Sequence, residues 1–174
     1  MGKLIDSVKF VVGTFPATAA NTTWNNQTYL LGNAINMENY GHLTVVLIGG
    51  PDAGPMGLTT LINAATDAQC VIAGIAAGTS WYVDPSYYYV NTCTSAESDT
   101  WTKTAVATAG STIITAPFTA ANENYIIELD SAALTHGPWV AINSVQGTAG
   151  IFAALYILSQ PRYISAEDAP SALA

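Results

Sequence analysis

Residues 151–158, which read IFAALYIL, decide the fold class of this 174-residue chain. Ile, Phe and Tyr favour strands, and the surrounding apolar run 149–158 is about half as long as a membrane-spanning helix needs to be. Successive side chains of a strand point to opposite faces. Both faces are apolar here: one carries Ile151, Ala153, Leu155 and Ile157, and the other carries Phe152, Ala154, Tyr156 and Leu158. The segment predicts a strand that needs cover on both sides.

Outward from this segment, stretches rich in Val, Ile, Thr and Tyr alternate with turn signals such as Gly49-Gly50-Pro51-Asp52. Short strands separated by regular turns are typical of an antiparallel β-sandwich. We expect an all-β domain over residues 1–162, followed by an extended C-terminal tail over residues 163–174. The predicted strands are 4–12, 29–31, 43–48, 58–62, 70–77, 87–91, 104–107, 112–115, 125–129, 139–143 and 151–158. Short helical turns are expected at 62–68 and 131–134, the second of them capped by Asp130.

Two further predicted strands share the doubly apolar character of residues 151–158. Residues 70–77 are apolar on both faces, and residues 43–48 are nearly so. An antiparallel strand with one face in water would instead alternate apolar and polar residues. The second face must therefore be covered by a long loop, by the tail or by another subunit.

The charge content narrows the class of partner. Charged residues make up 9% of the chain, against roughly 25% in typical soluble domains. The net charge is −8, and the four cations, Lys3, Lys9, Lys103 and Arg162, are scattered. Phosphate backbones and anionic membranes are bound by clustered cations. These numbers argue against nucleic acid and membrane surfaces and favour burial against other protein chains.

The N-terminus and the cysteines bear on the compartment. Residues 1–20 lack the uninterrupted apolar core of a signal peptide, so we expect synthesis without secretion. Cys70 and Cys93 leave one disulfide open, but two cysteines without a secretion signal are more often buried thiols.

Residue types that carry catalysis or bind metals are sparse. The histidines are His42, at the entry of a predicted strand, and His136, in a Gly-Pro turn. No Gly-x-Ser-x-Gly nucleophile motif, His-x-His pair or phosphate-binding loop is present. Glu128 and Asp130 share a strand face, which fits either a calcium ligand pair or a solvated strand end. We expect no enzyme activity, no bound metal and no cofactor.

An aromatic cluster is the most prominent candidate for recognition. It comprises Trp81, Tyr87, Tyr89 and Trp101, with Asp84, Asn91 and Asp99 nearby. Aromatic faces beside acids and amides serve as sugar platforms, and aromatic residues also form interface hot spots. Ordinary core packing is the third explanation.

Four segments in a fixed order carry a resemblance to a known group of proteins. They are residues 34–40 (AINMENY), 99–102 (DTWT), 124–134 (NYIIELDSAAL) and 154–163 (ALYILSQPRY). Each motif is short, and the order is what gives the set specificity. Between residues 34 and 163 the chain resembles structural proteins of tailed-bacteriophage virions, in particular head decoration (cement) proteins with a jelly-roll-like sandwich.

The resemblance implies a virion protein that is made in the host cytoplasm and decorates the capsid surface. Its implied partners are the major capsid protein and copies of itself in a symmetric dimer or trimer, with no nucleic acid and no membrane. Arg162-Tyr163, before the tail, is a candidate anchor, although Arg162 also has the option of pairing with a carboxylate of its own domain. The candidate interface residues are Trp81, Tyr87, Tyr89, Trp101, Phe152, Tyr156, Arg162 and Tyr163. The alternative function is a carbohydrate-binding or adhesin module that uses the aromatic cluster between Trp81 and Trp101.

Overall fold

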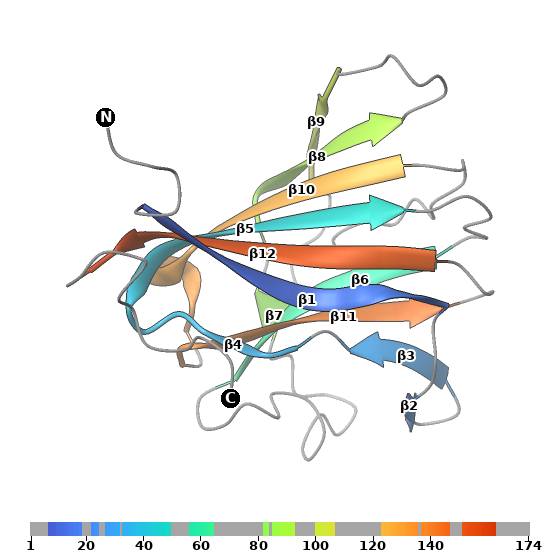
Figure 1. Cartoon of the computed structure of the whole chain (residues 1–174), viewed down its shortest axis with the longest axis horizontal. Helices are drawn as coiled ribbons and strands as arrows, with labels where there is room; N and C mark the ends of the chain where they lie inside the picture. Colours follow the sequence, from blue (N-terminus) through green and yellow to red (C-terminus); the bar gives the residue numbers. More distant parts are fainter. Residues whose placement is uncertain are drawn as a thin grey trace.

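The structure of the chain is a computed structural model. It describes residues 7–18, 22–24, 27–31, 33–49, 56–64, 82–83, 85–92, 100–106, 123–135, 137–146 and 151–162. These residues are almost entirely antiparallel β-structure, which confirms the all-β prediction (Figure 1). The strands are β1 (Val8–Thr18), β2 (Thr22–Trp24), β3 (Gln27–Leu31), β4 (Ile35–Asn36), β5 (Tyr40–Gly49), β6 (Met56–Ala64), β7 (Tyr82–Val83), β8 (Tyr87–Thr92), β9 (Thr102–Ala105), β10 (Glu123–Asp130), β11 (Trp139–Gln146) and β12 (Ile151–Pro161). The 3-10 helix η2 (Ser131–Ala133) follows β10.

The strands form two sheets. Sheet A has the order β1-β12-β5-β10-β8-β9, and Figure 1 shows these strands fanned out side by side. Sheet B has the order β2-β3-β11-β6-β7, with β4 also paired to β11. The first and last described strands, β1 and β12, are neighbours in sheet A.

Alternation along the central strands explains which side chains enter the core. In β5, Leu43, Val45 and Leu47 are buried, whereas the residues between them are partly exposed. In β10 the same holds for Tyr125, Ile127 and Leu129. The period of two is the strand signature, and it directs one side of sheet A to the core. Val140 and Ile142 of sheet B belong to the same buried cluster.

Strand β12 is apolar on both sides, as its sequence predicts. Ala154, Tyr156 and Leu158 are buried, whereas Ala153, Leu155 and Ile157 are partly exposed on the opposite side. We call this opposite side of sheet A the outer face. Its residues, placed by burial and strand register, are Phe10, Val12, His42, Thr44, Val46, Ile48, Tyr87, Tyr89, Lys103, Asn124, Ile126, Glu128, Asp130, Ala153, Leu155 and Ile157.

Tyr156 joins the two sheets. Its side chain is 0% exposed, and its hydroxyl accepts a hydrogen bond of 3.0 Å from the backbone N–H of Ile142 in β11. On that side of β11, pairing with β4 ends at Val140 and pairing with β3 begins at Asn143. The hydroxyl therefore satisfies a backbone donor at the interruption between two strand partners, where a buried N–H would otherwise be costly.

Gly13 of β1 lets this ring pack closely. A Cβ atom at Gly13 would lie 2.9 Å from the Tyr156 ring and 3.1 Å from the Ala154 Cβ. The β1–β12 register shifts on both sides of Thr14, where β1 bends past Pro16. β1 is the edge strand of sheet A, and edge strands tolerate proline because the missing N–H faces away from the ladder.

Several element boundaries differ from the predictions. Residues 62–64 of the expected helical turn belong to β6 instead, because they continue its pairing with β11. The turn at 131–134 is present as η2, but Asp130 makes no side-chain cap hydrogen bond, since its carboxylate is bonded to His42. The short strands β2, β4 and β7 were not predicted. The expected strands 70–77 and 112–115 and the tail 163–174 lie outside the described residues.

Candidate functional site

The outer face is the most unusual surface among the described residues. Four large apolar side chains are exposed, three of them on this face: Ile48 at 50%, Phe10 at 44% and Val12 at 40%. Val46, Ile126, Leu155 and Ile157 lie between them and are partly exposed. Contiguous apolar patches on soluble proteins mark interaction sites, whereas single exposed apolar residues do not.

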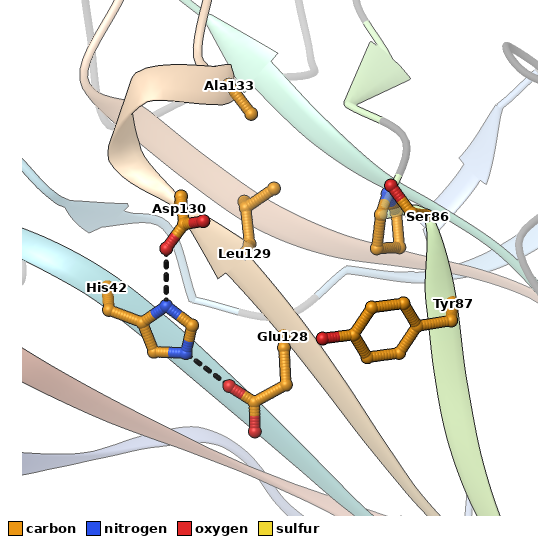
Figure 2. A pocket seen from close by; sticks show the side chains of 8 residues that line it. His42, Ser86, Tyr87, Glu128, Leu129, Asp130 and Ala133 are labelled. Carbon is orange, nitrogen blue, oxygen red and sulfur yellow. Dashed lines mark hydrogen bonds and ion pairs between the residues drawn. The ribbon is translucent and has the colours of Figure 1, made fainter. Parts of the chain in front are cut away.

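A charged cluster lies on the same face, at the start of β5 and the end of β10. The Nδ1 atom of His42 donates to Oδ1 of Asp130 at 2.8 Å, and Nε2 donates to Oε2 of Glu128 (Figure 2). Oε2 of Glu128 also accepts from the Thr44 hydroxyl at 3.1 Å. The strand register explains the contacts, because Asp130 pairs directly with His42 and Glu128 pairs with Thr44.

An imidazole that donates from both nitrogens is the imidazolium cation. Burial of the ring lowers the pKa of His42, while the hydrogen bonds to Asp130 and Glu128 and the charges of both carboxylates raise it, and the net shift is upward. The two hydrogen bonds and the upward shift of its pKa both favour the protonated form of His42. The side chains of the cluster fix β5 to β10 at the end of the sheet where η2 begins.

A hollow of about 150 Å³ lies beside the cluster. It is lined by His42, Pro85, Ser86, Tyr87, Glu128, Leu129, Asp130 and Ala133. Figure 2 shows Ser86 and His42 on opposite sides of this hollow, with the Tyr87 hydroxyl directed toward Glu128. General base catalysis needs an imidazole nitrogen free to take a proton from a nucleophile. Both nitrogens of His42 are hydrogen-bonded to carboxylates instead.

Metal ligation of Glu128 and Asp130 would have to compete with His42. Both carboxylates of the pair considered as possible calcium ligands are hydrogen-bonded to its ring. Within the described ranges, no group of three or more His, Cys, Asp and Glu side chains is arranged to hold a metal ion. The pairing of Asp130 with His42 was not predicted. The only signal was that Glu128 and Asp130 are spaced for one strand face and that His42 begins a strand.

The aromatic cluster is partly assembled on strands β8 and β9. The rings of Tyr87 and Tyr89 meet edge to face, with centroids 5.6 Å apart. The Nζ atom of Lys103 lies 3.6 Å from the centre of the Tyr87 ring and 6.0 Å from that of Tyr89. Trp101, at 40% exposed, precedes β9, while Trp81 lies outside the described residues. The lysine thus covers one face of the Tyr87 ring.

The remaining predicted interface residues are Phe152, Tyr156, Arg162 and Tyr163. Tyr156 was predicted to lie at an interface and instead lies in the core of the chain, because its position alternates with the outer-face residues of β12. Phe152 pairs with Gly49 in the ladder between β12 and β5. Tyr163 lies outside the described residues.

Arg162 is exposed at the end of β12. Its guanidinium donates to the Ser131 hydroxyl at 2.8 Å, and its backbone N–H donates to the carbonyl of Asn39. Within the described part of the chain its hydrogen-bond partner is therefore a hydroxyl of η2 rather than the carboxylate considered from the sequence. The contact places the last described residue beside the charged cluster.

Comparisons with protein-family models, with curated proteins and with solved structures gave no match. Across the described residues, no helix has the length and apolar character needed to cross a membrane. The chemistry and geometry of its own residues are therefore the basis for assigning a function.

Proposed function

We propose that this chain is a structural protein of a virion that decorates a bacteriophage capsid and stabilises it through protein–protein contacts. In this proposal the two sheets are the layers of a jelly-roll-like sandwich, and the protein is a symmetric oligomer bound to the major capsid protein. It is made in the host cytoplasm and resides on the capsid surface. The capsid is proposed as the partner because of the order of the four sequence segments between residues 34 and 163, while the contacts themselves are argued from the described residues.

The observation that carries the proposal is the apolar outer face in a chain with very few charges. Phe10, Val12 and Ile48 are each at least 40% exposed on one side of a single sheet. A charged residue content of 9% leaves few ionised groups to keep such a surface in water. Stable assemblies bury surfaces of this kind, depleted in charge and enriched in apolar and aromatic groups.

Particle binding tests the proposal directly. Purified chain is mixed with capsid shells of a tailed phage that encodes it, and with unrelated shells of similar size as the control. We expect saturable cosedimentation with the matching shells only and a higher temperature of shell disruption when the chain is bound. Equal recovery with both kinds of shell, or no recovery with either, would contradict the proposal.

Among the described residues, the feature that favours the carbohydrate-binding alternative is the exposed Trp101. Lys103 occupies one face of Tyr87, so a sugar stacking there would have to displace an ammonium group that the ring attracts. A glycan array with the wild type and Trp101→Ala tests this alternative. Binding to one glycan class that disappears in the variant would replace the structural assignment.

A further inference from the structure

The strand register arranges the outer face in rows that run across sheet A. One row takes a residue from each of the six strands and contains Val12, Leu155, Val46, Ile126, Tyr89 and Lys103. On one side of it lies a row with Phe10, Ile157, Thr44 and Glu128. On the other side lies a row with Ala153, Ile48, Asn124 and Asn91. The central row is apolar across five strands and ends at a single cation.

Ionisable groups lie at the margins of these rows. Lys103 is on the edge strand β9, where it is already stacked on Tyr87. Glu128 and Asp130 are toward one end, where both are paired with His42. The residues that β1, β12 and β5 contribute to these three rows carry no charge. A second surface can therefore cover the centre of the face without burying an unpaired charge, which would be costly.

The size of the face matches what a stable contact requires. Strands β1, β12, β5 and β10 contribute about seven residues each to the sheet area, whereas β8 has six residues and β9 has four. With about 4.8 Å between strands and about 3.3 Å per residue, the face covers about 600 Å² in projection. Specific interfaces bury at least about 500 Å² on each partner, and about 800 Å² is standard. The projected area of the face alone exceeds the lower of these two areas, and the side chains that project from the face add to it.

We propose that two copies of this chain pack through their outer faces, sheet against sheet about a two-fold axis, so that each apolar row covers the other. A two-fold contact uses the same patch on both partners, and a neutral apolar row meets this condition because apolar contact is non-directional. Twisted sheets pack face to face about 10 Å apart with their strands inclined by about 30°. The inference rests on the proposed function for the expectation of an oligomer and names the surface that forms it.

The test measures the mass of the full-length chain by light scattering after size exclusion, over a series of concentrations. Val12→Glu and Ile48→Glu each place a carboxylate on the face at a position where the single chain leaves at least 40% of the side chain exposed. The matched control is Ala132→Glu, which adds the same charge at an exposed residue of η2, outside the strands. Far-UV circular dichroism and thermal unfolding establish that each variant is folded.

We expect a wild-type dimer, a dimer for Ala132→Glu and a Kd raised by at least about 100-fold for Ile48→Glu, because each copy then buries an unpaired charge. We expect Val12→Glu to raise the Kd of the dimer as well. A dimer that survives both outer-face substitutions would overturn the inference, as would a trimer. A wild-type monomer that binds no apolar dye would also overturn it, because another part of the same chain would then cover the face.

The particle experiment separates this inference from the proposed function. A wild-type dimer that is sensitive to Ile48→Glu but does not bind capsid shells supports the face-to-face contact and contradicts the capsid role. A wild-type monomer that binds capsid shells contradicts the face-to-face contact and supports the capsid role.

Discussion

At the scale of single residues, Tyr156 and Tyr40 form a natural pair for measuring one hydrogen bond. Both side chains are almost completely buried, but the Tyr156 hydroxyl accepts from the Ile142 N–H, whereas the Tyr40 hydroxyl has no partner among the described residues. Tyr156→Phe leaves a buried backbone donor unsatisfied, so we expect a loss of about 1–3 kcal/mol in unfolding free energy. Tyr40→Phe is expected to be neutral or stabilising. Urea denaturation of both variants checks this, and equal losses would contradict the assigned role of Tyr156.

The second residue-scale prediction concerns His42 and pH. Its folded-state pKa is raised above the unfolded value of about 6.5. The stabilisation from the charged ring is therefore complete below about pH 6 and is lost as the pH rises through the folded pKa. We expect wild type to be more stable than His42→Gln by on the order of 1 kcal/mol near pH 6, since the partners are partly exposed.

This difference in stability should shrink as the pH is raised toward about 9. Thermal unfolding of both proteins across this range measures it, and every other titrating group is common to the two chains. A difference that stays constant with pH would show that His42 does not act through its charge.

The elements are held together by close contacts that a single methyl group would disturb. At Gly13 the added Cβ would meet the Tyr156 ring, whose hydroxyl is fixed to β11 and whose position is therefore not free to adjust. At Gly41 the closest atom would be Oε1 of Gln160, at 2.8 Å, which is the end of a flexible side chain. We expect Gly13→Ala to cost about 1–3 kcal/mol and Gly41→Ala to cost less. Chemical denaturation measures the loss of unfolding free energy in both variants. A larger loss for Gly41→Ala than for Gly13→Ala would contradict this account of β1.

Prediction from sequence succeeded for the long strands. β5, β10 and β12 could be recognised because each contains a run rich in Val, Ile, Leu or Tyr, whereas the alternation of buried and partly exposed residues along them became visible only in the structure. The two- and three-residue strands β2, β4 and β7 are too short to contain such a run, and their pairing depends on longer strands elsewhere in the chain. The continuation of β1 through Pro16 was missed because proline is tolerated only where the strand is an edge.

Part of the candidate site could be predicted from the sequence. The doubly apolar pattern of residues 151–158 indicated an outer face in need of cover, since alternation is a local property. The contact of His42 with Glu128 and Asp130 was not predicted, because it joins residues 86 and 88 positions apart through the β5–β10 register. Register over such a distance is set by the whole sheet.

At the scale of the whole molecule, charge and apolar surface make opposite contributions to association. Each copy has a net charge of −8, so two copies repel each other at low salt. Because added salt screens this repulsion over about 10 Å at 0.1 M, we expect the dimer Kd to fall by at least about twofold between low and moderate sodium chloride. Sedimentation equilibrium at several salt concentrations measures the trend. A dimer that weakens with salt would indicate ion pairs at the contact instead of the outer face.

The pairing of β1 with β12 has a consequence for biosynthesis. Sheet A places the first described strand beside the last, and β12 also lies between β1 and β5. A ribosome releases residues 151–161 only after all the other described strands, so until then neither β1 nor one edge of β5 has β12 to pair with. Pairings between distant parts of a chain form slowly, and open edges invite aggregation. The interval between the synthesis of β1 and that of β12 is therefore when we expect a newly made copy to be most prone to aggregation.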